Sequence, residues 1–343
     1  MQNFQDFQQL QIQTDRLRVA YYHIGEGNRK KLLVIHGNIS SSIFFMPLVP
    51  YLENRYDIIV PDLRCFGNTQ ALPIDATRGY RDWSDDIYAF CKAIGWKKFD
   101  LMGWSMGGDI AMQFVIDHAS MVRKLVLTAP GSPYGFGGTK DEKGTPHNPI
   151  GLGSGGGTVN PAFTATCQLW NGNVMRSMLN KYLFKEPFRM SKEWEDRFVK
   201  ASCAMRTGND YYPGDFQIAW KWPYVRSGNR GVLNTMSPEH GNLNALLDVT
   251  PKPPILWIRG DDDQIVSDHS MMEMGNLGRI GMIPGWPGER IYPPQPMIQQ
   301  TRYFLNQYKE KGGTFAEIVI PGGHVCILES PLHFISALDT FLK

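Results

Sequence analysis

The chain has 343 residues, of which 42% are hydrophobic and 20% charged, and its formal net charge is +2. This composition is typical of a globular protein with a sizeable core, and it gives no electrostatic reason to expect binding to nucleic acid or to an acidic membrane. The five cysteines form no C-x-x-C pair, so they predict neither a zinc site nor a disulfide framework and favour reduced thiols in a cytoplasmic protein.

The N-terminal stretch, residues 1–9, is polar and rich in glutamine. It has neither a basic segment nor an apolar segment of the kind found in secretory signals, so we expect no such signal here. No apolar run in the sequence is long enough to span a bilayer.

The first third of the chain alternates between strand and helix patterns. Its unbroken apolar runs are typical of strands buried on both faces of a parallel sheet. In chain order we predict a strand at 32–35, a helix at 44–51, a strand at 57–62, a helix at 81–96, a strand at 99–102, a helix at 105–118 and a strand at 122–128. This order predicts an α/β fold with a doubly wound, mostly parallel sheet.

The pattern breaks after residue 130. The segment 131–157 is rich in glycine and lacks periodicity, so it is either a disordered surface loop or a mobile lid. From 162 to 247 the sequence is irregularly helical and rich in aromatic residues. We interpret 131–249 as a helical, loop-rich cap inserted after the sixth strand, and 1–130 together with 250–343 as the sheet domain.

The strand and helix pattern then resumes. We predict a strand at 254–260, an irregular insertion at 275–296, a helix at 297–311, a strand at 315–320 and a helix at 331–343.

The sequence Gly103-Trp104-Ser105-Met106-Gly107 is the strongest chemical signal in the chain. The pattern G-x-S-x-G is common by chance, but here a predicted strand precedes it and a predicted helix follows, which is the context of a nucleophile elbow. Such a tight turn exposes the serine hydroxyl and aims the amino end of the helix at the reacting atom. We therefore predict Ser105 as a catalytic nucleophile.

A serine nucleophile needs a general base, and the base needs a carboxylate. His324 follows the last predicted strand and precedes the last predicted helix, which makes it the favoured base over the other seven histidines. Asp261, Asp262 and Asp263 follow the strand at 254–260, and their spacing alone does not decide which of them acts. The chain order Ser, Asp, His is the order expected for an elbow of this type.

An oxyanion hole combines two backbone N–H groups in such a site. Met106, directly after the nucleophile, is the first candidate, and Asn38, in the loop after the strand at 32–35, is the second. Asn38 can also be an ordinary turn residue.

These motifs together resemble the α/β-hydrolase superfamily, in its esterase, haloperoxidase-like and C–C-hydrolase branch. His36-Gly37 is similar to the oxyanion loop of that family, and residues 62–69 are similar to D-x-R-G-x-G-x-S, with Cys65 where glycine is usual. Residues 260–266 are similar to G-x-x-D-x-x-V, and the resemblance thereby selects Asp263 as the acid. Residues 323–331 are similar to the ending G-H-x-x-x-x-E-x-P.

The resemblance implies an α/β-hydrolase fold and acyl transfer to water without a metal or an organic cofactor. The aromatic cap suggests a roomy apolar pocket, although its rings can equally form the core of the cap. Candidate substrate contacts are Trp104, Trp170, Tyr212, Trp220 and Trp222. We expect the partners to be water and a bulky lipophilic ester or lactone, by analogy a macrolactone, and the protein to be a monomer or a homodimer.

Three alternatives stay open at this point. A C–C bond hydrolase uses the same triad. An aminopeptidase that acts on N-terminal proline needs an acidic anchor in the cap, such as Glu193, Glu195 or Asp210. A non-catalytic ligand-binding protein on the same fold is an alternative of another class, but it has no need for a complete triad.

Overall fold

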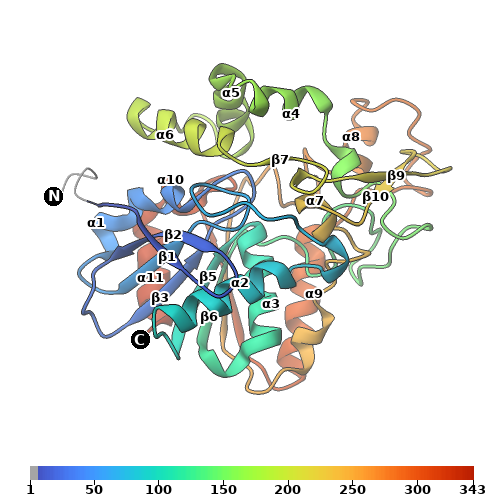
Figure 1. The fold of residues 1–343 in the computed structure, drawn as a ribbon. Helices are drawn as coiled ribbons and strands as arrows, with labels where there is room; N and C mark the ends of the chain where they lie inside the picture. The colour runs from blue at the N-terminus through green and yellow to red at the C-terminus, as the bar shows by residue number, and fades with distance from the viewer. Residues whose placement is uncertain (1–6) are drawn as a thin grey trace.

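The computed structural model of the protein describes residues 7–343, so most of the polar N-terminal stretch lies outside the described residues. Its centre is an eight-stranded sheet with the order β1-β2-β4-β3-β5-β6-β11-β12 (Figure 1). The strands are β1 (Leu10–Gln13), β2 (Arg18–Ile24), β3 (Lys31–Ile35), β4 (Asp57–Pro61), β5 (Phe99–Trp104), β6 (Val122–Thr128), β11 (Ile255–Gly260) and β12 (Phe315–Ile320). β2 is antiparallel to both its neighbours and all the other pairs are parallel, as the doubly wound prediction requires.

Helices cover both faces of this sheet. In Figure 1, α2 and α3 lie in front of it and α11 lies behind. The helices of the sheet domain are α1 (Val49–Leu52), α2 (Arg81–Ala93), α3 (Met106–His118), α8 (Met274–Arg279), α9 (Met297–Glu310), α10 (Cys326–Glu329) and α11 (Pro331–Phe341). The predicted helix at 44–51 is instead a 3₁₀ helix, Ser42–Leu48, that runs into α1, and Pro47 lies inside it.

The carboxyl ends of the central strands meet at one edge of the sheet. Ile35 of β3 pairs with Gly103 of β5, and Trp104 pairs with Thr128 of β6. At the end of β11, Gly260 pairs with Ile320 of β12. The loops that follow these strands therefore lie side by side, and they carry every catalytic candidate named above.

The segment between β6 and β11 lies above this edge (Figure 1). Its elements are α4 (Pro161–Gln168), α5 (Gly172–Tyr182), α6 (Lys192–Cys203), β7 (Thr207–Gly208), β8 (Tyr212–Pro213), β9 (Phe216–Ile218), β10 (Val225–Ser227) and α7 (Val232–Thr235). Residues 161–203 are helical, as expected for 162–247, whereas residues 207–227 form short two-stranded ladders that the sequence analysis did not predict.

The glycine-rich segment 131–157, expected to be either a disordered surface loop or a mobile lid, is largely buried in the structure. Residues 131–139 and 151–156 are almost entirely buried, and the stretch 140–150 between them reaches solvent. Two buried glutamines hold the segment: Gly137 N–H donates to Gln295 Oε1 at 2.6 Å, and Gln300 Nε2 donates to Thr139 Oγ1 at 2.9 Å. Because these hydrogen bonds join residues about 160 positions apart in sequence, the segment forms a wall that packs against Gln295 and Gln300.

The motif at residues 62–69 is a compact turn. Asp62 accepts hydrogen bonds from the backbone and hydroxyl of Ser42, and Arg64 forms a two-pronged ion pair with the buried Asp86. Cys65 has a φ of 75°, a conformation that favours glycine. The glycine usual in the resembled family is thus replaced here by a buried side chain that keeps the glycine-like backbone.

Candidate active site

Ser105 lies at a sharp turn between β5 and α3. Its backbone has φ 55° and ψ −130°, a strained conformation for a residue with a side chain. A Cβ atom at Gly103 would come within 2.2 Å of the carbonyl oxygen of Gly107, and one at Gly107 would come within 2.4 Å of that of His36. Both glycines are therefore required by close backbone approach, and the turn has the geometry of a nucleophile elbow.

His324 lies on the loop between β12 and α10, where it contacts Asp263. The His324 Nδ1 atom is 2.8 Å from Asp263 Oδ2, and both side chains are buried. The other carboxylate oxygen of Asp263 accepts the backbone N–H groups of Ile265 and Val266 at 2.8 and 2.9 Å. An ionised carboxylate only accepts hydrogen bonds, so Nδ1 carries the proton in the neutral ring and Nε2 is left as the basic nitrogen.

The other two aspartates of this loop have different partners. Asp261 accepts from Gly322 N–H at 3.0 Å and pairs with Lys185 Nζ at 2.9 Å. Asp262 accepts from the side chain of Gln264 at 2.9 Å. Of the three candidates, Asp263 is the one that contacts His324.

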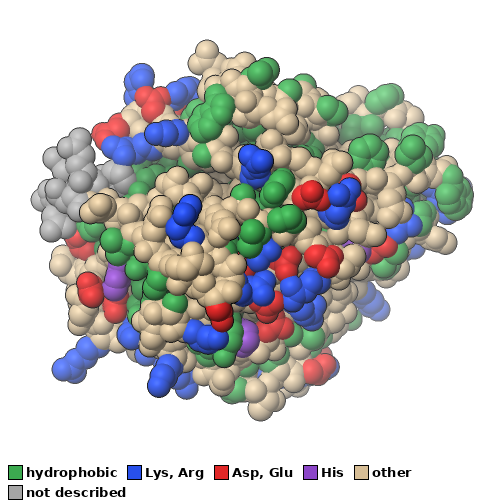
Figure 2. All heavy atoms as spheres, in the orientation of Figure 1, with side chains coloured by type: hydrophobic (Ala, Val, Ile, Leu, Met, Phe, Trp, Pro, Cys, Tyr) green, Lys and Arg blue, Asp and Glu red, His purple; other side chains and the backbone are tan. Residues whose placement is uncertain are grey.

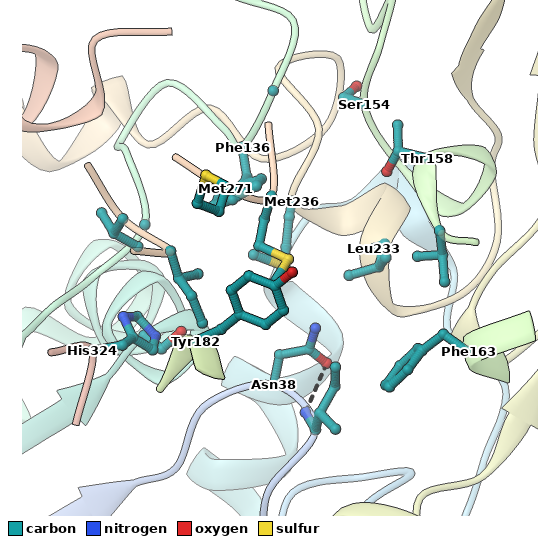
Figure 3. A pocket seen from close by; sticks show the side chains of 18 of the residues that line it. Asn38, Phe136, Ser154, Thr158, Phe163, Tyr182, Leu233, Met236, Met271 and His324 are labelled. Atoms are coloured by element: carbon teal, nitrogen blue, oxygen red, sulfur yellow. Dashed lines mark hydrogen bonds between the residues drawn. The ribbon is translucent and has the colours of Figure 1, made fainter. Parts of the chain in front are cut away.

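The loop after β3 packs directly against the elbow. A Cβ atom at Gly37 would lie 2.9 Å from Ser105 Cβ, so only glycine allows this approach. Asn38 follows at the cavity wall; its Oδ1 accepts the Ile39 N–H at 3.0 Å, and its amide nitrogen points into the cavity (Figure 3). Met106 is fully buried at the amino end of α3.

Trp104 ties the elbow to the histidine loop. Its Nε1 donates to the carbonyl oxygen of His324 at 2.9 Å, and the two rings lie 5.4 Å apart between centroids. Trp104 also lines the cavity, as predicted for a substrate contact. The indole thus fixes the backbone of His324.

Ser105 and His324 open into one cavity of about 400 Å³ (Figure 3). Tyr182 lies beside His324 in this view, Met236 and Met271 lie near the middle, and Leu233 and Phe163 lie at the far side. Among the described residues, those that line the cavity include no Asp, Glu, Lys or Arg. The cavity is therefore apolar, apart from a few amide and hydroxyl groups and the histidine.

A comparison with known protein families matches residues 30–290 to the family model for the alpha/beta hydrolase fold. The chain belongs to this family.

Among proteins of known sequence, the chain is 29% identical over 113 residues to the uncharacterized hydrolase YugF of Bacillus subtilis; the match covers 33% of this chain and 41% of that protein. It is 32% identical over 100 residues to a pimeloyl-[acyl-carrier protein] methyl ester esterase of Legionella pneumophila, covering 29% of this chain and 38% of that protein. The matches thus span less than half the length of these relatives.

The fold likeness extends further than the sequence likeness. An esterase from Exiguobacterium antarcticum superposes with a TM-score of 0.61 at 16% identity, over 98% of this chain and all of that one. At this identity the likeness shows the fold of an α/β-hydrolase and not its substrate.

Of the five predicted substrate contacts, three do not line the cavity of this α/β-hydrolase. Trp170, at the turn between α4 and α5, and Trp220, beyond the end of β9, are 57% and 74% exposed. Trp222 is buried, but against Tyr292 and Met274 in a small separate core. Tyr212 and Trp104 do line the cavity. Aromatic content alone does not say which way a ring points, because that depends on partners far away in sequence.

The sequence analysis missed most of the apolar lining. The missed residues come from five separate segments and include Ile39, Phe136, Phe163, Met178, Tyr182, Leu233, Met236 and Met271. Four methionines contribute to this wall, and the adjacent pair Met271-Met272, shortly after Asp263, was the one local signal available. Methionine side chains adapt to ligands of irregular shape.

Proposed function

We propose that this chain is a serine hydrolase that cleaves an uncharged carboxylic ester or lactone with a lipophilic body. The observation that carries the proposal is His324, which is held by Asp263 through Nδ1 and lines the same apolar cavity as Ser105. The contact between His324 and Asp263, and the cavity that His324 shares with Ser105, support the roles of base, orienting carboxylate and nucleophile in acyl transfer.

In the proposed reaction, His324 Nε2 takes the proton of Ser105 as its oxygen attacks the ester carbonyl carbon. The backbone N–H groups of Asn38 and Met106 stabilise the resulting oxyanion. His324 then gives the proton to the leaving alkoxide, and an acyl-enzyme remains on Ser105. Water, deprotonated by His324, attacks the acyl carbon, and the acid leaves as Ser105 regains its proton.

The uncharged cavity supports a neutral substrate. A substrate with a fixed charge would leave water for a wall without a counter-charge, which is costly. The candidate amine anchors of a proline aminopeptidase are engaged elsewhere: Glu193 pairs with Arg197, Glu195 with Arg176, and Asp210 with Arg230. None of the three lines the cavity, and this favours ester hydrolysis over the aminopeptidase alternative.

The first test is hydrolysis of p-nitrophenyl acetate and butyrate by the wild type and by Ser105→Ala. We expect the variant to lose essentially all turnover and to keep the thermal unfolding midpoint of the wild type. Covalent labelling of Ser105 by a fluorophosphonate, detected by peptide mass spectrometry, gives an independent readout. Unlabelled Ser105, or a variant that still turns over, contradicts the proposal and favours a binding protein.

The second test addresses the lipophilic body. Leu233 lies far from His324 in the cavity (Figure 3), so Leu233→Trp should shorten the space for an acyl chain without touching the reacting atoms. We expect kcat/KM for the octanoate ester to fall at least about tenfold while that for the acetate stays within about twofold. Leu233→Met, similar in volume, is the control. A panel with macrocyclic lactones and β-diketones then separates lactone and C–C substrates from simple esters.

A further inference from the structure

A two-stranded hairpin in the cap exposes a row of large apolar side chains. β9 and β10 project from the molecule at the right of Figure 1, and Figure 2 shows hydrophobic side chains gathered over them. Ile218 is 86% exposed and Trp220 74% exposed, and Phe216 and Tyr224 are also exposed. Surface patches of this kind usually mark a place of interaction.

The exposure does not result from a loose hairpin. Trp222, only two residues from Trp220, is buried: its Nε1 donates to the carbonyl oxygen of Pro284 at 3.0 Å, and its ring meets that of Tyr292 edge to face at 4.8 Å. Ala219 N–H also donates to the carbonyl oxygen of Tyr224 across the turn. A firm anchor therefore presents Trp220 to solvent.

The insertion that holds Trp222 adds to this surface. Ile280, Met282 and Ile291, on either side of Pro284, are exposed. The two segments that form this surface, residues 216–225 and 279–291, contain three positively charged side chains, Lys221, Arg279 and Arg290, and one negatively charged side chain, Glu289. Lys221 also lies over the ring of Trp220, 4.5 Å from its centroid. The apolar surface thus carries an excess of positive charge.

This surface borders the cavity. A Cβ atom at Gly157 would come within 2.8 Å of Phe216 Cβ, so the start of β9 packs directly on the 3₁₀ turn Gly156–Thr158. Thr158, the last residue of this turn, and the following Val159 line the cavity. The hairpin and the cavity are thus in contact with the same short turn.

We propose that the β9–β10 hairpin, with Ile218 and Trp220 at its centre, docks the protein on the surface of a lipid layer that contains anionic headgroups. Tryptophan and tyrosine favour the boundary between hydrocarbon and water, and the positive charges complement the headgroups. The proposed contact is with the surface of the lipid layer and does not span it. It departs from the sequence analysis, which expected no membrane contact from the net charge and the hydropathy. The additional consequence, that the substrate enters from the lipid, rests on the proposed function.

A projecting hairpin inserts into lipid more readily than it pairs with a second copy of itself, which requires a self-complementary face. Flotation with vesicles of phosphatidylcholine, alone and mixed with phosphatidylglycerol, tests the proposal on the full chain. We expect the wild type to float with the mixed vesicles and less with phosphatidylcholine alone. Ile218→Ser/Trp220→Ser should weaken this binding at least about tenfold, because two large apolar groups no longer leave water.

The control is Leu332→Ser, which removes another highly exposed aliphatic side chain, 70% exposed, from α11 in the sheet domain. It should bind vesicles like the wild type, and both variants should hydrolyse p-nitrophenyl acetate in solution at the wild-type rate. Ser105→Ala should also bind vesicles, so a failure of the proposed chemistry is distinguishable from a failure of docking. A wild type that does not float, or a double variant that floats equally well, overturns the proposal. A dimer in light scattering that the double variant dissociates assigns the hairpin to a second copy instead.

Discussion

Glu329 Oε1 accepts the backbone N–H of Gly323, the residue before His324, at 2.7 Å. The other oxygen of the same carboxylate accepts the N–H of Lys185, in the linker between α5 and α6, at 2.9 Å. Val325 N–H also donates to the carbonyl oxygen of Leu183, which lines the cavity. The loop on both sides of the proposed base is therefore joined to the cap, and the position of the imidazole depends on the cap being in place.

Glu329→Gln tests this positioning role. The amide has one acceptor where the carboxylate has two, so one of the two N–H groups loses its partner. We expect kcat for p-nitrophenyl butyrate to fall about tenfold, the loss from a base that is slightly misplaced, with a smaller change in KM. Asp261 also accepts a hydrogen bond from the histidine loop, at Gly322 N–H, but its side chain is exposed. Asp261→Asn should therefore keep kcat within about twofold. Equal effects on kcat in the two variants would remove Glu329 from any specific role.

Asp263→Asn should be far more damaging than the same change at its neighbours. The amide can donate to Nδ1 and so favours the tautomer in which Nε2 carries the proton and is no longer basic, a change that lowers kcat by about 10⁴-fold in serine hydrolases with this arrangement. Asp262→Asn, whose contact is the side chain of Gln264, should stay close to wild type. Steady-state kinetics of the three asparagine variants rank them, and any other order would reassign the acid.

Gln300→Ala should destabilise the protein through the glycine-rich wall. Gln300 Nε2 donates to Thr139 Oγ1 and to the carbonyl oxygen of Asp141, and its Oε1 accepts from Ser132 Oγ; the bonds to Thr139 and Ser132 are buried and the one to Asp141 is partly buried. Removing it leaves buried polar groups without partners, so we expect the free energy of unfolding to drop by about 2–4 kcal/mol. Its exposed neighbour Gln299 contacts Asp268, and Gln299→Ala should change little. Urea unfolding followed by circular dichroism makes the comparison.

Asp109 should make the free energy of unfolding depend on pH. It is buried on α3 behind the elbow, and among the described residues its Oδ1 has no hydrogen-bond partner. Burial raises the pKa of Asp109 well above its usual range, and the N–H of Gly131 and the hydroxyl of Tyr80 offset this only in part. The folded state therefore holds this proton at pH values where the unfolded chain has released it.

The sign follows from the number of protons bound in each state. Because the folded state binds more, the unfolding free energy falls as the pH rises above the unfolded pKa of an aspartate, and it continues to fall up to the raised folded pKa. Asp109→Asn removes this contribution, so its thermal midpoint should exceed that of the wild type by an amount that grows from pH 5 to pH 8. Parallel midpoint curves for the two proteins over this range would show that Asp109 is not the group responsible.

Local sequence patterns predicted the sheet and the elbow, because their causes are local. Gly103 and Gly107 are required by contacts within a few residues or with the neighbouring strand, and the apolar runs of β3 to β6 follow from burial on both faces. The sequence analysis did not predict β1 or β2. In the case of β1, the alternation of polar and apolar residues covers only four positions, and the strand is largely exposed.

The cap could not be predicted in the same way. Segment 131–157 has the composition of a flexible loop, and its order depends on Gln295 and Gln300, about 160 residues further along. Trp220 and Trp222 differ by two positions, yet one is exposed and the other buried, because only Trp222 meets Pro284 and Tyr292. Partners at this distance leave no trace in local periodicity.

The contact of Trp222 with Pro284 has a consequence for protein engineering. The hairpin depends on the insertion at 275–296 for its anchor, and a side chain at Gly278 would collide with both Trp222 and Trp286. The hairpin and the insertion are separated by some fifty residues of sequence, but their buried side chains form one shared hydrophobic core. Chimaeras with smaller α/β-hydrolases therefore have to transplant the two pieces together, since either one alone would bring an unmatched half of a shared core.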